Sequence, residues 1–360
     1  MPVMSRTTVT RTAVTRLVRA AAAVTTPMVP DDVFGLFSET WSSTEHRARV
    51  LEVRRETSDS VTVVLQPGRA LPRHLAGQYV RFGVDIDGVR HWRTYSLTTP
   101  PGASTLAITV KAVPGGLVSQ HVVHALKSGA IVRLDGPYGE FVLSEGDTAM
   151  LFVSAGSGIT PLMGMLRTLH SQRRSVDLVM IHSAPTKADV IFDAELAELA
   201  TELGITLHVQ HTDDDGMLTF EDVAAICPDW QARDAWVCGP GPMLDAAAEH
   251  WTSAELPHRL TMERFLLVSP TIDASETSEV SFERSQRRTT ANAAQSLLDA
   301  GESADVLMPS GCRMGICHTC VLPLKAGKVR DLRTGEIHGE AGDLVQTCVS
   351  AACTDTVLDV

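Results

Sequence analysis

Four cysteines near the C-terminus are spaced as the ligands of an iron–sulfur cluster. Cys312, Cys317 and Cys320 form a C-x4-C-x2-C run, and Cys348 lies 28 residues beyond Cys320. This is the plant-type spacing for a [2Fe–2S] cluster, in which each iron needs two thiolates. Gly315 allows a tight loop, whose backbone N–H groups can bond the cluster sulfurs. The spacing therefore predicts a [2Fe–2S] site.

A structural zinc site and a set of unrelated thiols are the alternatives. Zinc sites usually use C-x2-C pairs, and only Cys317 and Cys320 have that spacing. The chain has seven cysteines, an odd number that makes a poor disulfide framework. Five of them lie in the last 49 residues, and this clustering indicates a metal site in a reducing compartment. Cys227 and Cys353 have no ligand context, and we interpret both as core residues.

A second group of residues suits a phosphate-bearing aromatic ligand. In Arg93-Thr94-Tyr95-Ser96, the guanidinium fork fits a diphosphate, the ring offers a flat face and the serine can bond a ring nitrogen. Gly115-Gly116-Leu117-Val118-Ser119 precedes an expected helix, where backbone N–H groups can approach an anion. Each motif has a plain alternative, a strand with a surface arginine or an ordinary turn. Together, about 20 residues apart, they indicate a flavin dinucleotide site.

Short strands with alternating apolar residues surround these two motifs. Turn signals such as Pro67-Gly68 and Asp87-Gly88 separate them. The pattern predicts an antiparallel β-barrel over residues 44–147. The expected strands are 48–53, 60–65, 78–84 and 105–112, and the expected helix is 119–126.

After residue 148 the pattern changes to strands that alternate with helices. This alternation predicts a doubly wound parallel α/β sheet over residues 148–265. Gly156-Ser157-Gly158 lies between the first strand and a helix, where it can bind pyrophosphate, although the third glycine of the dinucleotide fingerprint is missing. Cys238-Gly239-Pro240 ends a later strand at the edge where ligands bind in open α/β folds. The expected strands are 150–154, 176–183, 206–210 and 235–238, with helices at 161–171 and 193–203.

Residues 44–265 resemble the ferredoxin–NADP reductase superfamily. Arg93-Thr94-Tyr95-Ser96 matches its flavin motif, and Gly136-Pro137-Tyr138-Gly139-Glu140-Phe141 matches its domain-junction motif. The resemblance implies that Arg93 and Thr94 lie in the FAD site, with Arg93 on the pyrophosphate. It also implies that Tyr95 packs on the isoalloxazine and that Ser96 approaches flavin N5.

The same resemblance implies further contacts to the two dinucleotides. Gly116 and Ser119 would contact the FAD phosphates, and this element favours FAD over FMN. In this superfamily Gly-x-Gly-x-Thr-Pro is the expected nucleotide loop, so Thr160 and Cys238 would lie near the nicotinamide. Together with Ser96, these two residues would border the hydride transfer from NAD(P)H.

The choice between NADPH and NADH is read after the second strand of the α/β region. Superfamily members that use NADPH tend to place serine and arginine there. This chain has Ser183 and Lys187, but no arginine at the expected place, and we expect NADPH rather than NADH. Phe265 is placed where related reductases hold an aromatic residue over the flavin, and simple packing is the alternative.

The polar segment 266–278 predicts a linker, and residues 279–360 predict an α+β, β-grasp ferredoxin-like [2Fe–2S] domain. We expect a strand at 280–282 and a helix at 292–300. This domain order resembles single-chain reductases that feed oxygenases and desaturases. It implies electron transfer from NAD(P)H through FAD and the cluster to an external acceptor.

The nature of the acceptor is a finer question. Residues 78–80 and 85–93 look most like the electron-transfer partners of stearoyl-CoA Δ9-desaturases, so we expect a membrane fatty acyl desaturase. The alternatives are a soluble ring-hydroxylating or Rieske oxygenase and, from another class, a non-enzymatic redox sensor.

The remaining expectations concern charge and location. The chain carries 43 acidic and 31 basic residues, a net charge of −12 that argues against nucleic-acid binding. Residues 1–43 form a basic arm and lead-in, because the first 30 residues contain four arginines and no acid. The arm is either a frayed tail or a peripheral contact to the inner face of the cell membrane. No apolar stretch is long enough to span a membrane, so we expect a cytoplasmic protein.

Overall fold

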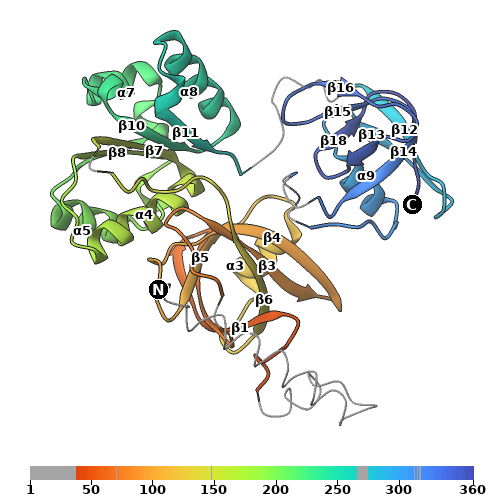
Figure 1. The fold of residues 1–360 in the computed structure, drawn as a ribbon, viewed down its shortest axis with the longest axis horizontal. Helices are drawn as coiled ribbons and strands as arrows, with labels where there is room; N and C mark the ends of the chain where they lie inside the picture. Colours follow the sequence, from red (N-terminus) through yellow and green to blue (C-terminus); the bar gives the residue numbers. More distant parts are fainter. Residues whose placement is uncertain are drawn as a thin grey trace, which may run out of the picture.

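The computed structural model contains three units built on sheets, which follow one another along the chain (Figure 1). In the part of the chain that it describes, no helix combines the length and hydrophobicity needed to cross a membrane. The expected basic arm, most of the expected linker, and Cys312 and Cys317 lie outside the described residues. Described are residues 38–69, 71–146, 148–265, 275–311, 313, 315 and 318–360.

The first unit is an antiparallel barrel of six strands in the order β4-β3-β6-β1-β2-β5. A bridge from Leu97 to Ile108 joins the chain after β4 to β5 and closes the barrel. Alternate residues such as Val80 and Phe82 fill its interior, while the intervening residues face outward. The strands are β1 (His46–Thr57), β2 (Ser60–Pro67), β3 (Tyr79–Ile86), β4 (Val89–Ser96), β5 (Leu106–Lys111) and β6 (Ile131–Tyr138), and the helix is α3 (Leu117–His124).

The structure corrects the helix bounds in this unit. Helix α3 begins at Leu117, two residues before the expected start, because extended Gly116 forms its N-cap. It ends at His124, because Ala125 leaves the helical conformation. Strand β6 was not among the expected strands, since it runs into the turn-like sequence Gly136-Pro137.

The second unit is a parallel five-stranded sheet in the order β11-β10-β7-β8-β9. Consecutive residues of β7 are fully buried on opposite faces, which explains its continuous apolar sequence. The elements are β7 (Met150–Ala155), α4 (Ile159–Ser171), β8 (Leu178–Ala184), α5 (Asp193–Leu203), β9 (Thr206–His211), α6 (Thr212–Asp215), α7 (Phe220–Ile226), β10 (Asp234–Cys238), α8 (Gly241–Ser253) and β11 (Leu260–Glu263). The expected doubly wound fold is confirmed, and β11, α7 and α8 add to it.

The third unit has a mixed five-stranded sheet in the order β13-β12-β19-β14-β17 and a small sheet in the order β16-β15-β18. Helix α9 begins at Leu297 rather than at residue 292, because Asn292 ends β13 and the Ser296 Oγ caps the helix by accepting from Asp299 N at 3.1 Å. The elements are β12 (Thr277–Phe282), β13 (Arg287–Asn292), α9 (Leu297–Ser303), β14 (Val321–Ala326), β15 (Val329–Asp331), β16 (Ile337–His338), β17 (Leu344–Gln346), β18 (Ser350–Ala352) and β19 (Thr356–Leu358).

The three units meet around the end of the barrel that holds β4. The parallel unit is joined to the barrel by direct contacts, since Trp236 Nε1 donates to Val142 O at 2.9 Å. Helix α4 lies so close to the barrel that a Cβ on Gly164 would be 2.4 Å from Leu97 O. The third unit lies beside the barrel, with α9 toward β4 (Figure 1). This arrangement brings the motifs of all three units toward one region.

Candidate flavin, nucleotide and iron–sulfur sites

A small cavity lies where the ends of β4 and β11 meet, between the barrel and the parallel sheet. Tyr79, Thr94 and Ser96 line it from the barrel, and Glu263 and Phe265 line it from the other side. Within the described residues, neither Ser96 Oγ nor Glu263 Oε2 has a hydrogen-bond partner, although both atoms are buried. Because buried polar atoms are normally bonded, these two atoms point to a ligand with a polar edge, such as an isoalloxazine ring.

Glu263 is a site residue that the sequence reasoning missed. It ends β11 and is paired in register with Cys238. Burial raises the pKa of its carboxyl to about 8, so the group is mostly protonated at neutral pH. A lone acid at the end of a short, mixed-polarity strand gives little signal. The adjacent Phe265, which was expected over the flavin, is the only hint in the sequence.

Arg93 and Tyr95 flank the same strand. Tyr95 is half-buried and packs against Phe82, with ring centroids 5.9 Å apart, and the desolvation of its hydroxyl raises the pKa of that group. Arg93 Nη1 donates to Trp92 O at 2.8 Å, and burial lowers the pKa of its guanidinium. No carboxylate of the described residues forms an ion pair with Arg93, which suits a diphosphate partner.

The glycine turn before α3 is held by the side chain of Ser119. Its Oγ accepts from Val113 N at 3.1 Å and donates to Gly116 O at 3.1 Å. Gly115 has φ +71°, and a Cβ on Gly116 would be 2.6 Å from Ser119 Oγ. The turn therefore requires both glycines, and it leaves the first N–H groups of α3 open to an anion. In this structure the Ser119 hydroxyl shapes the turn.

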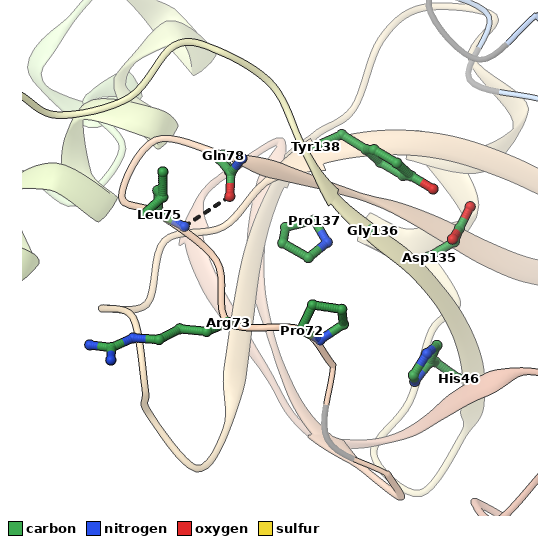
Figure 2. Close-up of a pocket in the computed structure, with 9 residues that line it drawn as sticks. All are labelled: His46, Pro72, Arg73, Leu75, Gln78, Asp135, Gly136, Pro137 and Tyr138. Carbon is green, nitrogen blue, oxygen red and sulfur yellow. Dashed lines mark hydrogen bonds between the residues drawn. The ribbon is translucent and has the colours of Figure 1, made fainter. Parts of the chain in front are cut away.

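A wider hollow of about 560 Å³ lies beside this region, between the loop before β3 and strand β6 (Figure 2). Gln78 holds its wall together, because its Oε1 accepts from Leu75 N at 2.8 Å and its Nε2 donates to Gly139 O at 3.0 Å. It thereby ties the loop to the junction motif. None of the residues predicted to bind FAD or NAD(P)H lines this hollow. Its lining residues are His46, Pro72, Arg73, Leu75, Gln78, Asp135, Gly136, Pro137 and Tyr138.

The predicted nucleotide residues converge at the carboxyl edge of the parallel sheet. The turn Gly156–Gly158 connects β7 to α4, and Gly156 takes φ +53°. Gly158 packs against the end of β10, where a Cβ would be 2.1 Å from Cys238 O. Thr160 Oγ1 donates to Ser157 O at 3.0 Å. The turn whose backbone could bind a pyrophosphate therefore lies next to Cys238. Burial raises the pKa of the Cys238 thiol well above its usual value.

The two residues expected at a 2′-phosphate lie near the end of β8, one within the strand and one just after it. Ser183 is buried, and Lys187 is exposed in a short turn, Lys187–Asp189. Next to them, Asp213 N donates to Pro185 O at 3.0 Å. Gly239 and Pro240 lead into α8 at the neighbouring strand end, as the sequence predicts for the nucleotide edge.

A buried polar pair lies beside these residues and was also missed. Ser154 Oγ and His182 Nδ1 are 2.8 Å apart, and both side chains are fully buried. Burial lowers the pKa of His182 to about 4, so the ring is neutral. In register, His182 pairs with Ser154, and Ser154 pairs with Cys238.

The described part of the cluster site contains two of the four predicted ligands. Cys320 and Cys348 are buried, with their Sγ atoms 3.1 Å apart. The hydrogen bond between Cys320 and Cys348 lowers the pKa of the Cys320 thiol. Thr347 Oγ1 donates to Cys320 O at 2.9 Å, which ties the two ligand segments together. Two adjacent buried thiols, of which Cys320 has a lowered pKa, fit thiolate ligation of iron.

The remaining cysteines separate into two environments. Cys227 is buried, as expected, and its Sγ donates to Asp229 Oδ1 at 3.3 Å. Cys353 is only half-buried, which corrects the expectation of a core position. It follows the last residue of β18, Ala352, at the point where the chain turns toward the surface.

The barrel, the parallel sheet and the third unit define a class of protein, an electron-transfer flavoprotein with an iron–sulfur domain. Models of three protein families match the chain in the same order. Residues 51–143 match the oxidoreductase FAD-binding domain, and residues 152–249 match the oxidoreductase NAD-binding domain. Residues 280–354 match the 2Fe-2S iron-sulfur cluster binding domain.

Several known proteins are similar over most of their length. An "NADPH oxidoreductase" of Mycobacterium tuberculosis is 49% identical over 349 residues, 95% of this chain and 91% of that protein. A "glycine betaine monooxygenase reductase subunit" of Pseudomonas aeruginosa is 27% identical, with 89% and 97% covered. Phthalate dioxygenase reductase has the same fold, with a TM-score of 0.66, 24% identity, and 88% of this chain and 98% of that chain covered.

The chain therefore belongs to the ferredoxin–NADP reductase superfamily, as a three-domain oxidoreductase that binds FAD, NAD(P)H and a [2Fe–2S] cluster.

Proposed function

We propose that this protein is the reductase component of an oxygenase system, which passes electrons from NADPH through FAD and the [2Fe–2S] cluster to an oxygenase. The cavity between Ser96 and Glu263 carries this proposal, because the ends of β4 and β11 meet there, β11 pairs with β10, and the cluster unit lies beside β4 (Figure 1). Relatives that are reductase components of monooxygenases support an oxygenase as the acceptor. These include the 3-ketosteroid-9-alpha-monooxygenase reductase component of Mycolicibacterium smegmatis, which is 28% identical over 83% of this chain.

The expected membrane desaturase is the weaker of the two acceptors. That expectation depends on residues 78–80 and 85–93, which form parts of β3, the β3–β4 turn and β4. There, Arg90 Nε donates to Asp85 Oδ1 at 3.0 Å across the hairpin. These residues form part of the barrel. A resemblance in this segment therefore indicates a similar flavin domain and does not indicate which acceptor the protein uses.

The side chains around the cavity have separate tasks in the proposed reaction. FAD, when bound, accepts a hydride from NADPH and releases electrons singly to the cluster. Ser96 would bond the polar edge of the isoalloxazine, and Glu263 would hold a proton beside it. Gly158, Thr160 and Cys238 would place the nicotinamide, and their burial excludes water. Arg93 would bind the FAD diphosphate.

The four cysteines Cys312, Cys317, Cys320 and Cys348 would ligate the cluster. A visible spectrum of the purified protein tests this assignment, because flavin bands and a broad iron–sulfur shoulder should both bleach with NADPH. Cys348→Ser should remove the iron–sulfur shoulder and transfer to the oxygenase, while FAD reduction persists. Cys227→Ser, which replaces a buried thiol outside the site, serves as the control. A colourless protein that contains zinc would contradict the proposal.

A preference for NADPH follows from the exposed cation at the end of β8. Lys187→Gln should lower kcat/KM for NADPH by about tenfold, the effect of losing roughly 1.4 kcal/mol from one charged contact, and leave that for NADH unchanged. Steady-state rates with both nucleotides measure this. A wild-type preference for NADH would contradict the proposed role of Lys187, because NADH has no 2′-phosphate for this side chain to bind.

Reconstitution with an acceptor distinguishes the possible partners. The holoprotein should support product formation by an oxygenase component with matching NADPH consumption. Coupling only to a desaturase in vesicles would overturn the oxygenase proposal.

Deletion of residues 1–30 tests the basic arm. If the deletion lowered coupling to a desaturase in vesicles and left cytochrome c reduction unchanged, the arm would be a membrane contact. Steady NADPH turnover with ferricyanide would exclude a sensor that only binds the cofactors.

A further inference from the structure

Two side chains from outside the cluster loop hold one of its carbonyl groups. Gly315 lies between Cys312 and Cys317 in the sequence. Gln346 Nε2 donates to Gly315 O at 3.0 Å, and Arg333 Nη1 donates to the same oxygen at 3.2 Å. Arg333 follows β15 and Gln346 ends β17, so Gly315 is held from two separate segments.

The contact between the loop and Arg333 is tight. Gly315 takes φ +71°, and a Cβ on it would be 2.5 Å from Arg333 Nη1 and 2.9 Å from Val349 Cγ1. Only glycine satisfies both the backbone conformation and this space. Gly315 therefore lies directly against the guanidinium, with no room for a side chain between them.

Both holding side chains are fixed in turn. Arg333 Nε and Nη2 donate to the Asp331 carboxylate at 3.0 and 2.6 Å, and Nη2 donates to Gln346 Oε1 at 3.3 Å. Gln346 Nε2 also donates to His318 Nδ1 at 2.9 Å, at the other end of the loop. An ordinary surface ion pair would involve only Arg333 and Asp331. Here the network spans Gly315 and His318 and ends two residues before Cys348.

We infer that Arg333 and Gln346 are positioning residues that fix the cluster loop and raise the reduction potential of the cluster. Each electron adds a negative charge to the cluster. The Arg333 guanidinium offsets the Asp331 carboxylate beside it, so the reduced cluster is more favourable than it would be next to an unpaired carboxylate. Hydrogen bonds around ligating segments are known levers on metal-site potentials. The inference rests on the proposed ligation of a [2Fe–2S] cluster by the four cysteines.

The test compares four variants of the full-length holoprotein. Arg333→Gln removes the charge, Arg333→Lys keeps it without the fork, and Gln346→Leu removes the amide. Arg288→Gln is the matched control, because it removes the same charge from the edge strand β13, where the side chain is 72% exposed. Potentiometric titration followed by EPR gives the cluster midpoint potential, and loss of visible absorbance in air gives the rate of cluster breakdown.

We expect Arg333→Gln to lower the equilibrium constant for cluster reduction by about tenfold, which is a 59 mV fall for a one-electron couple. Arg333→Lys should recover most of this shift. Gln346→Leu should broaden the EPR signal and speed cluster loss severalfold, and Arg288→Gln should match wild type. If Arg333→Gln cannot retain a cluster while Arg333→Lys and Arg288→Gln can, the positioning role is also supported.

Two results overturn the inference. One is a potential, EPR signal and breakdown rate that match wild type in both Arg333→Gln and Gln346→Leu. The other is an equal potential shift in Arg333→Gln and Arg288→Gln, which would show only a general charge effect. A wild-type protein without a [2Fe–2S] EPR signal would instead contradict the proposed cluster ligation, so the two failures are distinguishable.

Discussion

The buried hydroxyl of Ser96 has no hydrogen-bond partner among the described residues, and it lines the cavity between the barrel and the parallel sheet. We expect Ser96→Ala to slow FAD reduction by NADPH by about 10²-fold, the usual effect of losing a hydrogen-bonding group at a reacting centre. FAD content should not change. Anaerobic stopped-flow absorbance measures the rate. Thr109→Val is the control, because it removes a buried barrel hydroxyl bonded to Thr62 Oγ1 at 2.7 Å, away from the cavity. Equal rates in both variants would contradict a role for Ser96.

The raised pKa of Glu263 predicts that the stability of the fold depends on pH. Burial raises the pKa of its carboxyl from 4.5 to about 8, so between these values the folded protein holds a proton that the unfolded chain has released. The free energy of unfolding therefore falls as pH rises through this window. The stabilisation that comes from keeping Glu263 protonated is complete below about pH 4.5 and lost above about pH 8.

Glu263→Gln should remove this dependence. We expect the Tm of wild type to decrease relative to the variant as pH rises across the window, as thermal unfolding followed by circular dichroism would show. Glu249→Gln, which replaces an exposed carboxyl on α8, should leave the wild-type slope unchanged. Parallel pH profiles for wild type and Glu263→Gln would contradict the burial of an uncompensated carboxyl.

The N-terminus of α4 packs closely against the end of β10, because Gly158 has no side chain. A Cβ there would be 2.1 Å from Cys238 O, so Gly158→Ala must push the nucleotide loop away from the strand. Overpacking of this kind costs about 1–3 kcal/mol, so we expect the KM for NADPH to rise by about tenfold or more.

The control for Gly158→Ala is Gly146→Ala. An added Cβ at Gly146 would have only Thr148 Cγ2 near it, at 3.9 Å, and NADPH kinetics should not change. FAD content should stay at the wild-type level in both variants, because the barrel is untouched. A normal KM in Gly158→Ala would show that this turn does not bind the nucleotide.

Element boundaries show where sequence patterns fail. Asn292 belongs to β13 although it begins an apparently helical segment, because pairing of β13 with β12 extends through Asn292. Strand β11 has only four residues and mixed polarity, so no periodicity marks it, yet its pairing with β10 positions Glu263. In both cases strand partners that are distant in sequence decide the local structure.

The barrel and the parallel unit are joined through Arg167 on α4. Its Nη1 donates to Thr98 O at 2.7 Å, and its Nε and Nη2 donate to the Glu195 carboxylate at 2.7 Å each. We expect Arg167→Met to lower the Tm by about 5 °C and slow FAD reduction, because hydrogen bonds to charged groups contribute about 1.5–3 kcal/mol and these are partly shielded from water. Differential scanning fluorimetry and stopped-flow absorbance measure these effects.

Arg284→Gln separates this effect from the general effect of losing an ion pair. Arg284 also forms a two-bond contact, to Asp359 at 2.8 and 2.7 Å, but its side chain is 73% exposed. Exposed pairs contribute about 0–1 kcal/mol, so its Tm should stay near that of wild type. Equal Tm values for both variants would contradict a joint held by Arg167.

The sequence by itself determined the cofactor classes and the order of the three units. A cluster loop, a phosphate-binding turn and a flavin strand are each built from residues a few positions apart, so their spacing records the chemistry directly. The alternation of strands and helices likewise determined the fold class.

Only the tertiary structure decided which distant residues complete these sites. Glu263 lines the same cavity as Ser96 because β11 pairs with β10 in the parallel sheet. Ser154 meets His182 because β7 pairs with β8, and Arg333 and Gln346 reach Gly315 because two sheets converge on the cluster loop. Strand order and packing create these contacts, and neither leaves a local pattern in the sequence.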